Sequence, residues 1–137
     1  MSKTEWRGVR RFVYERANGC CEYCQTSEQN TGQAMQIDHI FPDGGDEVDN
    51  LCLACWSCNN YKRQVITAND PVTETQIALY NPRTQKWKEH FVWIENSTVI
   101  QGLTVNGRAT IVRLKMNRPS LLVARQRWVE GGYHPPS

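Results

Sequence analysis

Hydrophobic and polar residues follow a helical spacing near the N-terminus. The pattern predicts a helix over residues 5–17, with Thr4 as its N-cap and Gly19 at its end. The apolar face of this helix consists of Val9, Phe12, Val13 and Ala17. Gly19 then leads into a segment that is rich in cysteine.

Shorter patterns follow the first helix. Weak alternation over residues 35–40 and 48–53 predicts two short strands, and the Pro-Asp-Gly-Gly sequence at residues 42–45 predicts a turn between them. Residues 25–33 are polar and are expected to form a loop, and helical character resumes over residues 57–65. The predicted order is therefore strand, loop, strand, helix.

The C-terminal half contains β-rich and helical segments. Residues 91–94 and 99–103 are rich in β-branched and aromatic side chains and predict a hairpin. After the hairpin we expect a short helix that opens at Asn106. A second helix is expected to start at Pro119 and to end at Gly131.

Length and composition bound the class of protein. The chain has 137 residues, of which 39% are hydrophobic and 22% charged, as in an ordinary globular protein with one core. We predict an α+β fold in a single domain, with a core over about residues 18–66 and a hairpin-plus-helices extension over about residues 67–137. Since no apolar run reaches the length of a membrane span and no signal-peptide pattern is present, a cytoplasmic protein without membrane contact is expected.

Charge is distributed unevenly along the chain. The formal net charge is only +2, from 16 basic and 14 acidic side chains. Residues 1–58 hold five basic and nine acidic side chains, whereas residues 59–137 hold eleven and five. No Lys or Arg occurs between Arg16 and Lys62. An acidic segment thus precedes a C-terminal half that is basic enough to favour nucleic acid.

All six cysteines lie between residues 20 and 58, with the spacing of metal knuckles. Cys21 and Cys24 form one C-x2-C pair and Cys55 and Cys58 form another, with 30 residues between the two pairs. Two such pairs supply four thiolates to one tetrahedral Zn²⁺. The sequence therefore predicts a structural zinc site, which contributes about 10–16 kcal/mol to folding in zinc-finger peptides.

Two other cysteine pairings and one other chemistry are also open. Cys20 can pair with Cys24 across three residues, and Cys52 forms a C-x2-C with Cys55. Because Cys52 falls on the alternating run of the second predicted strand, a small buried residue is favoured at that position. Six cysteines would also suit a disulfide network, which is typical of small secreted proteins.

The polar residues between and beside the knuckles are each common in structural roles. An Asp-His pair such as Asp38-His39 is usually structural or exposed to solvent, Asn50 alone suggests a turn, and Asn59 alone suggests a helix N-cap. Together, in the order C-x2-C, Ile-Asp-His-Ile-x-Pro, Asp-Asn-Leu and C-x2-C-Asn-x2-Lys, they resemble the HNH nuclease family. The resemblance covers residues 20–63, about a third of the chain.

The resemblance implies a ββα-metal (His-Me finger) core and a role for each matching residue. His39 matches the general base that takes a proton from the attacking water. Asp38 and Asn59 match the two protein ligands of a single catalytic divalent metal, and Asn50 matches the residue that braces the loop around His39. With Asn at the last position the chain is an HNN variant, and its oxygen ligands favour Mg²⁺ or Mn²⁺.

DNA is the expected partner. Lys62 and Arg63 follow Asn59 by about one helical turn and are candidates for contacts with the DNA backbone, as are Arg10 and Arg11 on the first helix. We expect a zinc-stabilised HNH endonuclease that hydrolyses DNA phosphodiester bonds as a monomer or homodimer, with RNA as the other substrate to test. The alternative is a zinc-dependent DNA-binding module without cleavage activity, and the complete set of four matching residues argues against it.

Overall fold

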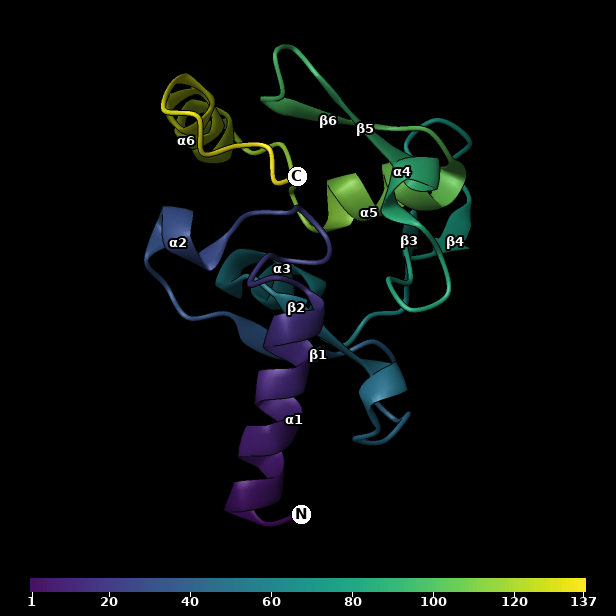
Figure 1. Cartoon of the computed structure of the whole chain (residues 1–137). Coiled ribbons are helices and arrows are strands. Elements are labelled where there is room, and N and C mark those ends of the chain that lie inside the picture. Colours follow the sequence, from purple (N-terminus) through teal and green to yellow (C-terminus); the bar gives the residue numbers. More distant parts are fainter.

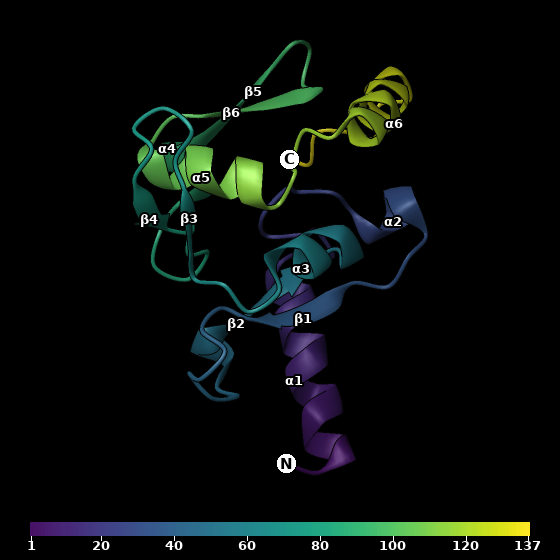
Figure 2. The same cartoon turned by 180° about the vertical axis from the view of Figure 1, so that it is seen from behind.

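The computed structural model describes residues 1–137 and combines helices with three small two-stranded antiparallel sheets (Figures 1 and 2). In chain order the elements are α1 Lys3–Arg16, α2 Glu28–Thr31, β1 Gln36–His39, η1 Val48–Asn50, β2 Leu51–Ala54, α3 Trp56–Lys62, β3 Thr67–Asn69, β4 Gln76–Ala78, α4 Trp87–His90, β5 Phe91–Ile94, β6 Val99–Gly102, α5 Val105–Arg113 and α6 Pro119–Glu130. This mixture is compatible with the predicted α+β class. None of the helices has the length and apolar character needed to span a membrane.

The first helix begins earlier than the sequence pattern predicts, because Ser2 and not Thr4 is its N-cap. The Ser2 hydroxyl accepts a hydrogen bond from the Glu5 N–H at 3.1 Å, which satisfies one of the free donors of the first turn. Of the predicted apolar face only Val13 is fully buried, and Phe12 is 48% exposed. The N-terminal end of α1 projects from the rest of the molecule in both views (Figures 1 and 2), which leaves that part of its surface open.

β1 and β2 form an antiparallel hairpin on which α3 packs (Figure 2). In the register Asp38 pairs with Cys52 and His39 pairs with Leu51. The second strand begins three residues later than predicted, because Val48–Asn50 form the 3₁₀ turn η1 and not a strand. The order strand, loop, strand, helix is confirmed.

Two other boundaries in this region differ from the predictions. α3 ends at Lys62 and not at residue 65, because Arg63 adopts a φ of 54°, outside the helical region. The polar segment 25–33 contains the one-turn helix α2, in which the Ser27 hydroxyl accepts a hydrogen bond from the Asn30 N–H at 3.1 Å.

β3 and β4 form a hairpin that the sequence pattern did not predict. Asp70, directly after β3, is fully buried, and its carboxylate accepts hydrogen bonds from the Arg108 guanidinium of α5 at 2.9 and 3.0 Å. The same guanidinium holds the pKa of Asp70 well below its usual range. This bidentate pair fixes the short hairpin to α5.

The β5–β6 hairpin and the two later helices are confirmed, with one change at a cap. Thr104 is the N-cap of α5, because its hydroxyl accepts a hydrogen bond from the Gly107 N–H at 3.1 Å. Asn106, the predicted cap, instead donates to the Ala78 carbonyl at 2.9 Å. α6 starts at Pro119 and ends at Glu130, with Gly131 as its C-cap, as predicted.

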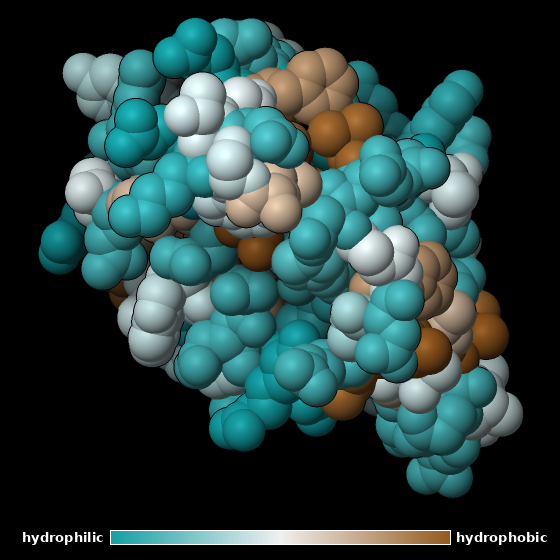
Figure 3. Space-filling view, turned by 90° about the horizontal axis from the view of Figure 1, so that it is seen from below, coloured by the Kyte–Doolittle hydropathy of each residue, from teal (hydrophilic) through white to brown (hydrophobic).

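Both halves of the chain share one continuous cluster of buried side chains. It runs from α1 through the first hairpin to the C-terminal half and includes Val13, Leu53, Phe91, Ile100 and Met116. The surface in Figure 3 is mostly hydrophilic, with small separate apolar patches. Because residues from both halves cover one another, neither half has a complete core by itself.

α6 is anchored by a buried arginine. The Arg125 guanidinium donates to the Thr98 carbonyl at 2.9 Å and to the Met116 carbonyl at 2.6 Å, and it lies 5.1 Å from the centre of the Trp93 ring. Burial lowers the pKa of Arg125 to about 10. Because the side chain is fully buried, Arg125 is not available to bind DNA.

Two glycine substitutions are expected to change stability in opposite directions. A Cβ at Gly107 would lie 2.3 Å from the His90 carbonyl oxygen, a backbone atom that cannot give way easily. Gly107→Ala should therefore lower the free energy of unfolding by about 1–3 kcal/mol. Gly8 lies inside α1 with nothing within 4 Å of such a Cβ, so Gly8→Ala should raise it by about 0.5–1 kcal/mol. Urea unfolding of the zinc-loaded proteins measures both, and a Gly107→Ala variant as stable as the native protein would contradict the packing described around α5.

Candidate active site and metal centre

Four cysteine sulfurs meet at one point in the protein interior. Cys21 and Cys24 come from the first knuckle, and Cys55 and Cys58 come from the N-terminus of α3. All four Sγ atoms lie within 4.8 Å of one another, and the Cys24 and Cys55 sulfurs are 3.7 Å apart. Tetrahedral Zn²⁺ with Zn–S bonds of about 2.3 Å separates its sulfurs by about 3.8 Å. The cluster is therefore consistent with a structural zinc site.

The other cysteine pairings are not the ones the fold uses. Cys20 lies outside the cluster, and its Sγ contacts only the Asn18 carbonyl, at 3.5 Å. Cys52 is fully buried beside Tyr23, as expected for a small core residue. All six cysteines are free thiols, and the meeting of four sulfurs at one point favours a metal over a disulfide network.

The ionisation of the cluster fits a cation. Burial raises the pKa of Cys21 well above its usual value, and hydrogen bonding with the neighbouring thiols raises that of Cys58. Hydrogen bonds from the same neighbours lower the pKa of Cys24. Four thiolates cannot share this buried space without a compensating positive charge, so full deprotonation requires a bound metal.

Three of the candidate catalytic residues line one cavity at the surface. Asp38 and His39 come from β1 and Asn59 comes from α3, and the cavity between them has a volume of about 200 Å³. Since neighbouring side chains on a strand point to opposite faces, Asp38 faces inward and is 4% exposed, whereas the His39 side chain is 36% exposed. Arg63 lies at the rim of the same cavity.

The His39 ring is held by an acidic residue from the following loop. Its Nε2 atom lies 2.7 Å from the Asp46 carboxylate oxygen. This contact leaves Nδ1 without a partner in the protein, so Nδ1 is free to act on a substrate. Asp46 was not predicted, because the loop carries several similar carboxylates and only the folded structure brings this one to the His39 ring.

Asn50 fixes the loop that follows His39. Its side-chain oxygen accepts from the Phe41 N–H at 3.0 Å, and its amide donates to the carbonyls of Phe41 and Gly45, both at 2.9 Å. A Cβ at Gly44 would lie 2.7 Å from this amide, so the bare glycine leaves the space that Asn50 fills. Asn50 thus lies against the loop that the resemblance implies it should brace.

A buried network holds the Asp38 carboxylate from behind. The Tyr23 hydroxyl donates to Oδ2 at 2.8 Å, and the Lys62 ammonium lies 3.2 Å from Oδ1 and 3.1 Å from Oδ2. Lys62 also donates to the His39 carbonyl at 3.1 Å. Tyr23 lies within the first cysteine knuckle and Lys62 closes α3, so both knuckle segments contribute to the position of Asp38. Tyr23 was not predicted, because nothing in its spacing distinguishes it from a core residue.

The expected DNA contact by Lys62 is wrong. Its side chain is only 2% exposed, because α3 turns it toward Asp38 and away from solvent. Arg63 is exposed at the cavity rim. On α1, Arg11 is exposed, but the Arg10 guanidinium binds the Met35 carbonyl at 3.0 Å and lies over the Tyr14 ring. Arg10 therefore has a structural contact, and its role toward DNA stays a prediction.

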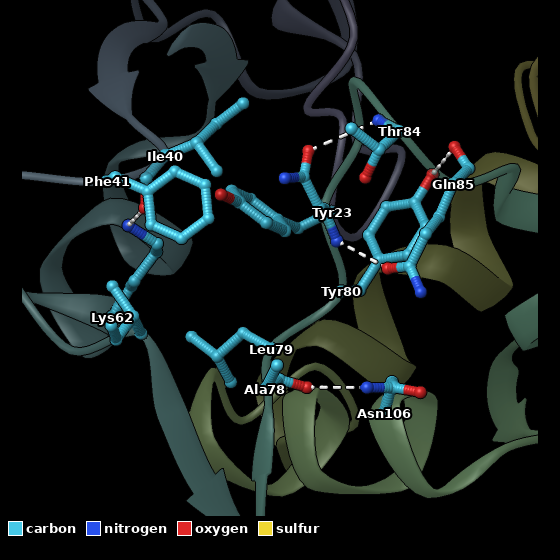
Figure 4. A pocket seen from close by; sticks show the side chains of 12 residues that line it. Tyr23, Ile40, Phe41, Lys62, Ala78, Leu79, Tyr80, Thr84, Gln85 and Asn106 are labelled. Atoms are coloured by element: carbon cyan, nitrogen blue, oxygen red, sulfur yellow. Dashed lines mark hydrogen bonds between the residues drawn. The ribbon is translucent and has the colours of Figure 1, made fainter. Parts of the chain in front are cut away.

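The C-terminal half closes the far side of this network. A separate cavity of about 210 Å³ lies between the two halves of the chain, and Figure 4 shows Phe41 and Lys62 on one side of it and Leu79 and Asn106 on another. Tyr23 lies between these walls, with its hydroxyl toward Lys62. Residues 66–106, which had no assigned role in the sequence, thus help to bury the lysine and the tyrosine that hold Asp38.

Loss of one partner of the buried ion pair between Asp38 and Lys62 is expected to destabilise the protein. Lys62→Met should lower the free energy of unfolding by about 3–5 kcal/mol, because the Asp38 carboxylate stays buried without its cation. The double variant Asp38→Asn/Lys62→Met should recover much of this loss. Urea unfolding without added Mg²⁺ measures these two variants and the single variant Asp38→Asn, and a double variant as destabilised as the sum of the two single ones would contradict the pairing.

Comparison with known families agrees with this geometry. Residues 21–64 match the sequence model of the HNH endonuclease family, which confirms the resemblance over this segment. No curated protein and no solved structure matches the chain. The matched segment carries both cysteine pairs and the residues of the candidate active site, and it suggests a nuclease-type function with a nucleic-acid substrate.

Proposed function

We propose that the protein is a metal-dependent endonuclease of the HNN type that hydrolyses DNA phosphodiester bonds, and that β1, β2 and α3 form its ββα-metal core. The observation that carries this proposal is the single cavity shared by Asp38, His39 and Asn59 inside the segment that matches the HNH family. The three side chains come from two elements, and they combine a base with two oxygen donors.

Asp38 and Asn59 fit a divalent cation. A carboxylate offers about four acceptor sites, and Oδ1 of Asp38 uses only one of its own, for Lys62. The Asn59 side chain lines the same cavity and makes no hydrogen bond within the protein. Hard oxygen donors of this kind suit Mg²⁺ or Mn²⁺. When bound, the cation would stabilise the charge on the phosphate and on the leaving oxygen.

The remaining steps belong to the side chains of the protein. His39 takes a proton from the attacking water at Nδ1, while Asp46 holds the ring through Nε2. Asn50 keeps the loop after His39 in place, and Tyr23 keeps Asp38 in one orientation. Arg63 contacts a phosphate oxygen at the rim of the cavity.

Plasmid cleavage tests the proposal. Purified zinc-loaded protein is incubated with supercoiled plasmid in Mg²⁺, in Mn²⁺ and without a divalent cation, and the products are separated on a gel. We expect conversion to open-circular or linear DNA only where the cation is present. Binding to the plasmid without conversion in either metal would contradict the proposal and would favour the zinc-dependent DNA-binding module.

A further inference from the structure

Three basic side chains, at the end of α5 and in the connection to α6, have no acidic partner, and two of them lie over Tyr61 of α3. Arg113, Lys115 and Arg118 take part in none of the ion pairs of the protein, whereas Lys62, Arg83 and Arg108 each pair with a carboxylate. We propose that Arg113, Lys115 and Arg118, here called the basic strip, bind the phosphate backbone of double-stranded DNA next to the candidate active site. The inference deepens the proposed function and rests on it for the choice of partner.

The basic strip is held against α3 through an aromatic ring. The Lys115 ammonium lies 4.9 Å and the Arg118 guanidinium 6.0 Å from the centre of the Tyr61 ring. Both cations are therefore placed before any ligand arrives, which reduces the entropy lost on binding. Tyr61 lies two residues after Asn59 and two before Arg63, so α3 connects the basic strip to the candidate active site.

The basic strip continues into an open groove on the neighbouring hairpin. This groove has a volume of about 460 Å³, and Arg113 and Lys115 line it together with Thr67 and Asn69. No carboxylate lines it, so nothing in its wall opposes a phosphate. Hydroxyl, amide and guanidinium donors in one groove are the groups that bind DNA phosphates.

Negative charge on the other side of the candidate active site indicates how a DNA duplex would be oriented. The loop that leads to η1 and η1 itself carry the exposed carboxylates Asp43, Asp46, Glu47 and Asp49. In Figures 1 and 2 this loop lies below α3, and the connection between α5 and α6 lies above it. A polyanion is repelled on the side of the loop and attracted on the side of the basic strip. The duplex is therefore expected to cross α3 with its flanking phosphates on the basic strip.

The basic strip also gives the C-terminal half a role toward the substrate. The segment that matches the HNH family ends at residue 64, so all three cations lie outside it. Within the matched segment only Arg63 is an exposed cation, and Lys62 is neutralised by Asp38. One exposed cation gives little affinity for a polyanion, and the basic strip supplies the charge that the matched segment lacks.

The test measures DNA binding by charge-matched variants. In a His39→Ala background, which prevents cleavage, the triple variant Arg113→Gln/Lys115→Gln/Arg118→Gln is compared with Lys86→Gln/Lys88→Gln/Arg127→Gln, which removes three exposed cations elsewhere. Fluorescence anisotropy with a labelled 20-base-pair DNA duplex is recorded over a range of NaCl concentrations. We expect the first triple variant to bind roughly tenfold more weakly, with a salt slope smaller by about 2–3, and the second to keep both values.

Two further variants separate the effect of charge from damage to the local structure. Arg113→Lys/Arg118→Lys retains the charges and should bind nearly as the parent does, and Lys115→Gln alone should lower the slope by about 1 without affecting α6. Equal losses in both triple variants, or retained affinity in the first, would overturn the inference, as would binding of an RNA duplex and not of DNA.

A small substrate separates this inference from the proposed function. With the native His39, hydrolysis of bis(p-nitrophenyl) phosphate needs the catalytic residues and not the basic strip, so the strip variants should keep it while they lose plasmid cleavage. If the native protein binds DNA through the basic strip and hydrolyses neither substrate, the inference stands and the proposed function fails.

Discussion

Replacing Cys55 with serine is expected to abolish zinc binding and to unfold the protein. Cys55 is both a member of the four-sulfur cluster and the N-cap of α3, where its sulfur accepts from the Cys58 N–H at 3.4 Å. Zinc at such a site contributes about 10–16 kcal/mol in zinc-finger peptides, more than the whole stability of most small domains. Loss of one ligand should therefore remove the cooperative thermal transition.

Metal analysis and thermal melting check this expectation, with Cys20→Ser as the matched control. Cys20 is adjacent to Cys21 but outside the cluster, so its replacement should leave one zinc per chain and a nearly unchanged melting temperature. A Cys55→Ser protein that keeps one zinc and a cooperative transition would show that the cluster is not the structural site. Chelation of the native protein should produce the same unfolding as the variant.

The second large effect is expected at His39. His39→Ala should lower the rate of plasmid cleavage by about 10²–10⁴, because the water loses its general base. The side chain is at the surface, and its only side-chain partner is Asp46, so the zinc content and the melting temperature should change little. The effect is thus expected on the chemical step and not on folding.

Two further measurements show whether the effect of His39→Ala comes from the loss of the base: the DNA affinity of this variant and the cleavage rate of Asp46→Asn. The variant should bind the DNA duplex as the native protein does, which separates a lost base from a lost docking surface. Asp46→Asn, which weakens the support of the ring and keeps the ring itself, should cost less than removal of the ring. Cleavage by His39→Ala at the native rate would remove His39 from the mechanism.

The metal cluster could be predicted from the sequence more fully than the rest of the site. Two C-x2-C pairs define their own local geometry, because each tight turn points both of its sulfurs to one side. The residues around Asp38 depend instead on how α3 is rotated against the hairpin. The spacing Asn59-x2-Lys62 places the lysine near the cavity but does not say that it faces inward. The burial of Lys62 follows from the packing of α3 on the hairpin, which the sequence pattern does not specify.

Errors in the predicted elements have similar causes. Residues 48–50 alternate as a strand would, but the hydrogen bonds of the Asn50 side chain to Phe41 and Gly45 require the backbone to turn there. The β3–β4 hairpin has strands of only three residues, which is too short for an alternating pattern to be recognised. In each case tertiary contacts decided what the local pattern left open.

The shared core limits how this protein can be used in protein engineering. A fragment that stops near residue 66 would carry the whole family-matched segment, yet it would lose Leu79, which lines the cavity beside Tyr23 and Lys62. It would also lose the Trp87 indole, which donates to the Tyr23 carbonyl at 2.8 Å. A fusion designed to use the proposed nuclease activity at a programmed site therefore has to carry the full chain, because a fragment limited to the family-matched segment would lack the contacts that support the candidate active site.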